Sequence, residues 1–264
     1  MLLDLSLVAS PQQPFTSISR FGRPTIASKK YLYDLDDSDD GAGSGQPRTI
    51  HELRAAGRNE RVTRELEALL EDTANHSVSA RSRRRVALLE LAQMFLDKDG
   101  AERFIALGFE QTLLAECEAP PDAIADFLLG AGTALLLASD VPEHSLAPFK
   151  KVLPWFTRAL SQHADVGKLA KDRRNNMSRA AQGDLLELAA RMKACSQLWE
   201  ENQPSDLSPR LIALRAIEIV VTKSRRLGDR SALLDEDALL QIFPGQDLET
   251  IDCTTSLDLS LIHI

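Results

Sequence analysis

Residue types that could bind calcium occur near the N-terminus, but their spacing is incomplete. Asp36, Ser38, Asp40 and Gly41 occupy positions 1, 3, 5 and 6 of a helix–loop–helix calcium site. Position 12, which must supply two carboxylate oxygens, is Pro47, and no helical pattern precedes the loop. We therefore interpret this acidic stretch as a linker.

Patterns for catalysis or for a cofactor are absent from the sequence. The five histidines show no HxxxH spacing, and none has a cysteine within four positions. No serine or cysteine stands in a nucleophile elbow, and the glycine-rich stretch 41–45 follows no strand that would make it a phosphate-binding loop. The sequence predicts a protein that is not an enzyme and that has no cofactor and no metal site.

Basic side chains form a more informative pattern. They gather in three clusters: Arg81, Arg83, Arg84 and Arg85; Lys168, Lys171, Arg173 and Arg174; and Lys223, Arg225, Arg226 and Arg230. The third cluster falls in the last turn of a predicted helix, where cations complement the helix dipole and a structural role is favoured. The first falls in a first turn, where cations are unfavourable, so it is the better candidate for function. All three could serve acidic protein partners or phosphates.

The composition indicates a helical intracellular protein. The chain has 264 residues, a net charge of −8, 44% hydrophobic residues and only 5% aromatic residues. The acidic balance argues against sequence-specific nucleic-acid binding, and three scattered cysteines fit a reducing compartment. The longest uncharged stretch, 127–139, is shorter than the roughly 20 residues of a membrane helix, and no basic signal-peptide start is present.

The chain divides into two parts. Residues 1–47 carry four prolines, an acidic run and a glycine-rich stretch, which predicts a disordered tail. From Thr49 onward the pattern is helical. Thr49 and Glu52 form a capping box, and Gly57 is expected to end that first short helix. Further helices are expected over 62–70, 79–96, 101–107, 109–117, 122–138, 152–163, 183–198, 209–227 and 235–242.

The helix at 209–227 has the clearest boundaries, with Ser208 as N-cap, Pro209 in the first position and Gly228 at the end. Short helices joined by polar turns, without a convincing strand, predict an all-α fold. Helices that are apolar on several sides favour an irregular HEAT- or armadillo-like α-solenoid over a four-helix bundle.

An ordered set of short segments is more specific than any one of them. They are HELR at 51–54 with Gly57, LEALLED at 66–72, RRVALLELA at 84–92, and Phe104, Leu107 and Gly108, then more loosely APPD at 119–122, the small-residue helix to Ser139, and residues 208–228. In this set the chain resembles the C-terminal domain of the wings apart-like (Wapl) family over about residues 48–245.

The resemblance implies a HEAT-like helical domain without enzyme activity. Family members are nuclear regulators that bind cohesin, at its ATPase head and kleisin, and its HEAT-repeat accessory subunits, and that promote cohesin release from chromatin. Family tails carry Phe-Gly-Phe motifs for the accessory subunit, whereas this tail offers Phe21-Gly22-Arg23. The family domain also continues further, so the Wapl-like domain at 48–264 is expected to be incomplete at its C-terminal end.

The polar face of the first elements is the predicted partner surface. Its candidate residues are Glu52, Arg54, Arg58, Arg61, Arg81, Arg84 and Arg85. For each of them the alternative is simple solvation or an intramolecular ion pair. If Arg84 and Arg85 contact a partner, replacing both with Glu should abolish binding and leave helicity intact. Two other functions stay open: an armadillo-like nuclear scaffold with a different protein client, and a helical enzyme with an unrecognised site.

Overall fold

The protein is all-helical where its structure is described. The computed structural model describes residues 49–139, 142, 145–199 and 203–243, without the side chains of 50–56 and 58. In these residues no β-strand occurs, and the all-α prediction is confirmed. The elements are α1 (Ile50–Ala74), η1 (Val78–Ala80), α2 (Arg81–Phe95), α3 (Lys98–Ala106), α4 (Glu110–Ala115), η2 (Glu116–Glu118), α5 (Ala123–Ala138), α6 (Leu146–Lys151), α7 (Leu153–Ala159), α8 (Val166–Lys171), η4 (Arg173–Asn175), α9 (Arg179–Lys193), α10 (Pro209–Arg226) and α11 (Glu236–Ile242).

Side-chain caps begin α5 and α10, and glycines follow the ends of α3 and α10. The Asp122 carboxylate accepts hydrogen bonds from the first backbone N–H groups of α5, and the Ser208 hydroxyl accepts from Leu211 N at the start of α10. Gly108 and Gly228 follow α3 and α10 with φ of 73° and 79°, a left-handed conformation that only glycine adopts readily. These boundaries agree with those predicted from the sequence.

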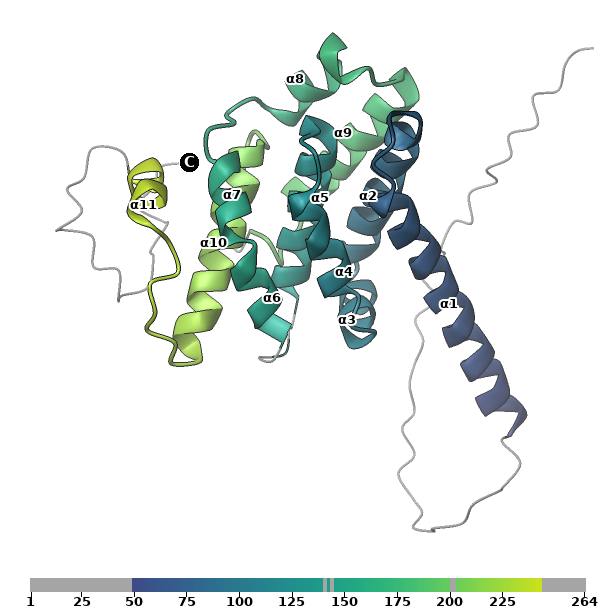
Figure 1. Ribbon diagram of the computed structural model, residues 1–264. Coiled ribbons are helices and arrows are strands. Elements are labelled where there is room, and N and C mark those ends of the chain that lie inside the picture. Colours follow the sequence, from purple (N-terminus) through teal and green to yellow (C-terminus); the bar gives the residue numbers. More distant parts are fainter. Residues whose placement is uncertain (1–48, 140–141, 143–144, 200–202, 244–264) are drawn as a thin grey trace, which may run out of the picture. The chain divides into compact units, whose positions relative to one another are not determined.

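Helix α5 is the centre of the core. Every residue from Phe127 to Leu137 is buried, so this helix has no polar face and needs neighbours on all sides. Its two glycines face aromatic rings: a Cβ at Gly132 would lie 3.5 Å from Phe95, and one at Gly130 would lie 3.5 Å from Trp155. Figure 1 shows α5 between α2 and α10, the two helices that pack most extensively on it.

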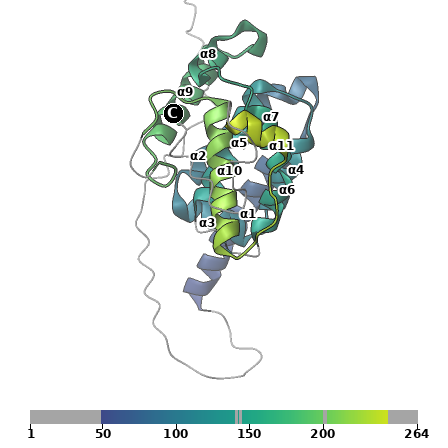
Figure 2. The same ribbon diagram turned by 90° about the vertical axis from the view of Figure 1, so that its left-hand side faces the viewer.

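The described helices pack both on elements near them in the sequence and on elements far along the chain. The pairs α1–α2, α2–α5 and α5–α10 are in contact, and α6 and α7 cover α10. Figure 2 shows α11 beside α7 and α10, where Arg210 donates to Gln241 O at 3.0 Å. Helix α9 packs back on α2, and α10 packs back on α5, in both cases across several intervening elements. A regular solenoid has contacts only between adjacent repeats, so the solenoid assignment stays a prediction.

Several predicted boundaries are wrong. Helix α1 runs through Gly57 as one helix of 25 residues, because a glycine inside a helix is unfavourable but does not break its hydrogen bonds. The helix expected at 152–163 ends at Ala159 and is preceded by a separate helix, α6, with Pro154 in the first turn of α7. Helix α9 begins at Arg179, before the expected 183, because Ser178 caps it. The predicted tail at 1–47 and the chain after 243 lie outside the described residues.

The continuity of α1 gives a test at Gly57. Replacing Gly57 with Ala should raise stability by up to about 1 kcal/mol, because alanine has the higher helix propensity. The matched change Gly228→Ala should lower stability by about 1 kcal/mol, because φ is positive there. Urea unfolding followed by far-UV circular dichroism measures both. Destabilisation by Gly57→Ala would show that the helix ends at this glycine.

Candidate functional site: the charged network at the start of α2

The first turn of α2 carries four arginines, which is an unusual load for a helix N-terminus. The positive end of the helix dipole repels cations, so these side chains need carboxylates nearby. The structure supplies one to each. Arg81 and Arg85 lie beside Asp122, Arg83 lies beside Asp72, and Arg84 lies beside Glu116. We call these four arginines and three carboxylates the α2 network.

Arg84 is the buried member of the α2 network. Its side chain is 6% exposed, and its Nη2 lies 3.3 Å from Glu116 Oε2, on a carboxylate that is itself 8% exposed. The Nε of Arg84 donates to Thr73 O at 2.9 Å, so the same guanidinium joins the end of α1 to η2. His76 Nε2 lies 3.5 Å from the same Glu116 oxygen. A buried ion pair of this kind is costly to break because the remaining charge stays in the interior.

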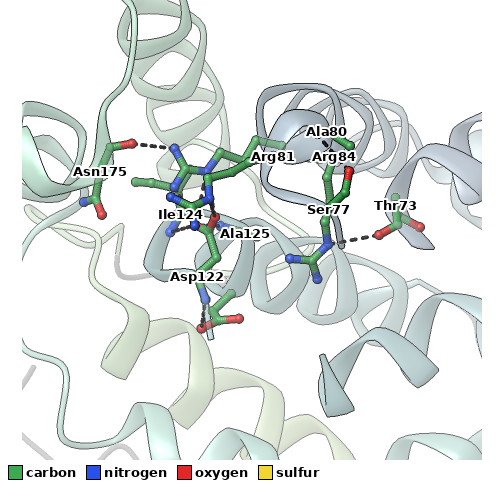
Figure 3. A network of polar contacts seen from close by, with 11 residues as sticks. Thr73, Ser77, Ala80, Arg81, Arg84, Asp122, Ile124, Ala125 and Asn175 are labelled. Carbon is green, nitrogen blue, oxygen red and sulfur yellow. Dashed lines mark hydrogen bonds and ion pairs between the residues drawn. The ribbon is translucent and has the colours of Figure 1, made fainter. Parts of the chain in front are cut away.

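Arg85 makes the most bonds in the α2 network. It binds the Asp122 carboxylate in a fork, with Nε 3.0 Å from Oδ2 and Nη2 2.8 Å from Oδ1. Its Nη1 donates to Asn175 O at 2.6 Å. Asp122 Oδ1 also accepts from Ile124 N and Ala125 N at the start of α5. Figure 3 shows Asp122 below these groups and Asn175 to one side, so one cluster joins α2, α5 and η4.

The bonds of the α2 network control the ionisation of Asp122. Burial by itself would raise the pKa of this carboxyl. The hydrogen bond from Arg85, those from Ala125 N and Ile124 N, and the Arg85 charge together outweigh it and lower the pKa. Because its pKa is lowered, Asp122 stays ionised to a lower pH than an ordinary aspartate does.

Two neighbouring groups behave in the opposite way because fewer donors compensate their burial. Burial raises the pKa of Asp126 to about 6, against a hydrogen bond from Asp122 N and with a further rise from the Asp122 charge. Burial raises the pKa of the Cys117 thiol to about 12, so this cysteine is not a nucleophile at neutral pH.

The structure separates the predicted partner residues into three groups. Arg84 and Arg85 have the intramolecular partners that were the alternative to a partner contact, and neither can reach another molecule without breaking those bonds. Arg81 is 53% exposed, with Nε 3.7 Å from Asp122, and Arg61 is 82% exposed and pairs with Glu65 on its own helix. The side chains of Glu52, Arg54 and Arg58 lie outside the described residues, although all three belong to α1.

In the described part of the chain we find little that could bind a metal ion or hold a small molecule. Its searched residues contain no group of three or more His, Cys, Asp or Glu side chains that could hold a metal ion. One open hollow of about 470 Å³ lies between α7, α10 and α11, and Arg158, Arg210 and His163 are part of its lining. Both arginines donate to backbone carbonyls, from Cys117 and from Leu160 and Gln241. None of the described helices is long and apolar enough to cross a bilayer.

Comparison with known protein families identifies the family of this chain. Residues 46–256 match the family model described as wings apart-like protein regulation of heterochromatin. The chain belongs to the wings apart-like family. This is a family of non-catalytic regulators, and the resemblance stated from the sequence is confirmed. No curated protein and no solved structure matches this wings apart-like chain.

The second basic cluster of this wings apart-like chain, for which the sequence favours no particular role, lies on the surface. Lys168, Lys171, Arg173 and Arg174 are all exposed on α8 and η4. A signal for this was present in the sequence, because Asp165 and Asp172 precede short helices as N-caps. In the structure the carboxylates of Asp165 and Asp172 accept from the backbone N–H groups of Gly167 and Arg174.

The Arg84–Glu116 pair gives a stability test in the wings apart-like chain. Arg84→Met should lower the free energy of unfolding by about 3 kcal/mol, because Glu116 is left buried without its cation. Arg83→Met is the matched control: Arg83 is 68% exposed, and its loss should change stability by less than about 0.5 kcal/mol. Adding Glu116→Gln to Arg84→Met should recover part of the loss. Equal effects of the two methionine variants in urea unfolding would contradict a buried pair.

The raised pKa of Asp126 gives a pH test. Because the folded pKa is about 6 and the ordinary value is 3.8, the folded state holds a proton that the unfolded state releases between these values. Stability from this group therefore falls as the pH rises toward 6 and stays low above it. Asp126→Asn should raise stability by about 1–2 kcal/mol at about pH 7, and the gain should vanish near about pH 4. Urea unfolding of both proteins at the two pH values measures this, and a gain independent of pH would contradict it.

Proposed function

We propose that this protein is a non-catalytic regulator that binds cohesin and its HEAT-repeat accessory subunits and promotes cohesin release from chromatin. Membership of the wings apart-like family over residues 46–256 carries the proposal. The protein acts in the nucleus on chromatin, and it contacts the ATPase head and kleisin region of cohesin. Release needs no catalytic step by this protein, because a bound regulator shifts the ring toward whichever state it binds more tightly.

The surface around the start of α2 supports a binding role. Val78 is 82% exposed and Val86 is 50% exposed, and the exposed side chains of Arg81 and Arg83 lie on the same part of the chain. Arginine is enriched in protein interfaces, and exposed apolar side chains beside it add surface that a partner can bury. Arg61 and Arg81 stay in the proposed contact surface, together with Glu52, Arg54 and Arg58 on α1. Arg84 and Arg85 instead support it from within.

Binding to purified cohesin tests the proposal. The full chain should co-elute with cohesin and its accessory subunits at physiological salt, and it should accelerate the loss of cohesin from DNA. Replacing Arg61 and Arg81 with Ala should weaken the complex about tenfold, if each side chain contributes an ordinary interface contact. The matched pair Arg103→Ala and Arg226→Ala removes two exposed cations elsewhere and should leave binding unchanged.

Far-UV circular dichroism must show the same helix content in all variants. A folded chain that forms no complex with cohesin contradicts the proposal. Stoichiometric binding to an unrelated nuclear protein instead would favour the armadillo-like scaffold.

A further inference from the structure

The clearest unpaired charge in the described residues is a basic surface on α8, η4 and the first residue of α9. It consists of Lys168, Lys171, Arg173, Arg174 and Arg179, and all five side chains are exposed. Residues 165–179 hold these five cations and two carboxylates, Asp165 and Asp172, on a chain with a net charge of −8. We call this group the α8–α9 basic surface.

The two nearby carboxylates are occupied by the backbone. Asp165 accepts from Gly167 N at 2.8 Å and from Leu207 N at 3.2 Å, and Asp172 accepts from Arg174 N at 2.9 Å. In the part of the chain that the structure describes, no ion pair joins any of the five cations to an acidic side chain. The contrast is with the α2 network, in which every arginine has a carboxylate beside it.

The α8–α9 basic surface is held in place by the rest of the fold. Asn175 O accepts from Arg85 Nη1 at 2.6 Å, and Asn175 Nδ2 donates to Leu169 O at 2.8 Å. Asn176 has φ of 47°, which turns the chain sharply, and the following Met177 packs against the core. A surface that is already ordered loses little conformational entropy when a ligand binds.

We infer that the α8–α9 basic surface binds a short acidic segment of a partner protein, one that carries several Asp or Glu side chains. Arginine forks pair well with carboxylates, and a local positive field steers a short acidic segment to it. Nucleic acid fits less well. Residues 165–179 contain no aromatic side chain for base stacking, and a long polyanion would extend over an otherwise acidic molecule. The inference does not depend on the cohesin proposal, because any partner protein with such an acidic segment would bind this surface.

A labelled peptide of alternating Glu and Gly residues tests the inference directly. The full chain should bind it in fluorescence anisotropy, and binding should weaken steeply as salt rises, because exposed charges are screened. Arg173→Glu with Arg174→Glu should weaken binding by about tenfold or more, and Lys168→Glu with Lys171→Glu should do so independently.

The matched control is Arg103→Glu with Lys151→Glu, the same charge change at exposed positions on α3 and α6. Figure 1 shows these two helices at the lower end of the unit and α8 at the upper end. This control should keep peptide binding within about twofold of the unchanged chain. Three results would overturn the inference: no binding of the peptide, equal weakening by the control pair, or tighter binding of duplex DNA of the same length.

Discussion

The forked ion pair between Arg85 and Asp122 holds together elements that the backbone leaves far apart. Asp122 caps α5 through Ile124 N and Ala125 N while it binds Arg85 on α2, and Arg85 in turn binds Asn175 O in η4. Hydrogen bonds between ionised groups are the strong ones, and this pair is only about a tenth exposed. The pair therefore contributes both to the orientation of the central helix and to the position of the α8–α9 basic surface.

Burial affects neighbouring charges differently according to the donors around them. Asp122 has Arg85 and two backbone N–H groups, and its pKa falls despite burial. Asp126, on the same helix, accepts only from Asp122 N, and its pKa rises to about 6. The fold therefore contains a stabilised carboxylate and a destabilised one a single helical turn apart. The difference comes from Arg85, which α2 brings to Asp122, since Asp126 has no hydrogen bond from an arginine among the described contacts.

The sequence predicts those parts of the fold whose signals are local. The boundaries of α10 are predicted because Ser208 and Gly228 act on adjacent backbone groups, and the predicted range 122–138 matches α5 with its cap Asp122. The local sequence does not decide whether α1 ends at Gly57, since a glycine can end a helix or lie within one. The role of Arg84 could have been found: it shares one helical stripe with the buried Leu88 and Leu91. The partners of Arg85 could not have been found from the sequence, because only tertiary packing brings Asp122 and Asn175 to this side chain.

The all-round apolar surface of α5 has a consequence during synthesis. Helix α10 packs on α5, with its Ile212 side chain against Gly130. It is translated long after α5 itself. At ribosomal speeds the interval is on the order of ten seconds, far longer than helix formation or hydrophobic collapse requires. In that interval the nascent chain carries a formed helix whose most hydrophobic flank has no cover. Until α10 is translated, this uncovered side makes the nascent chain prone to aggregation and a substrate for chaperones.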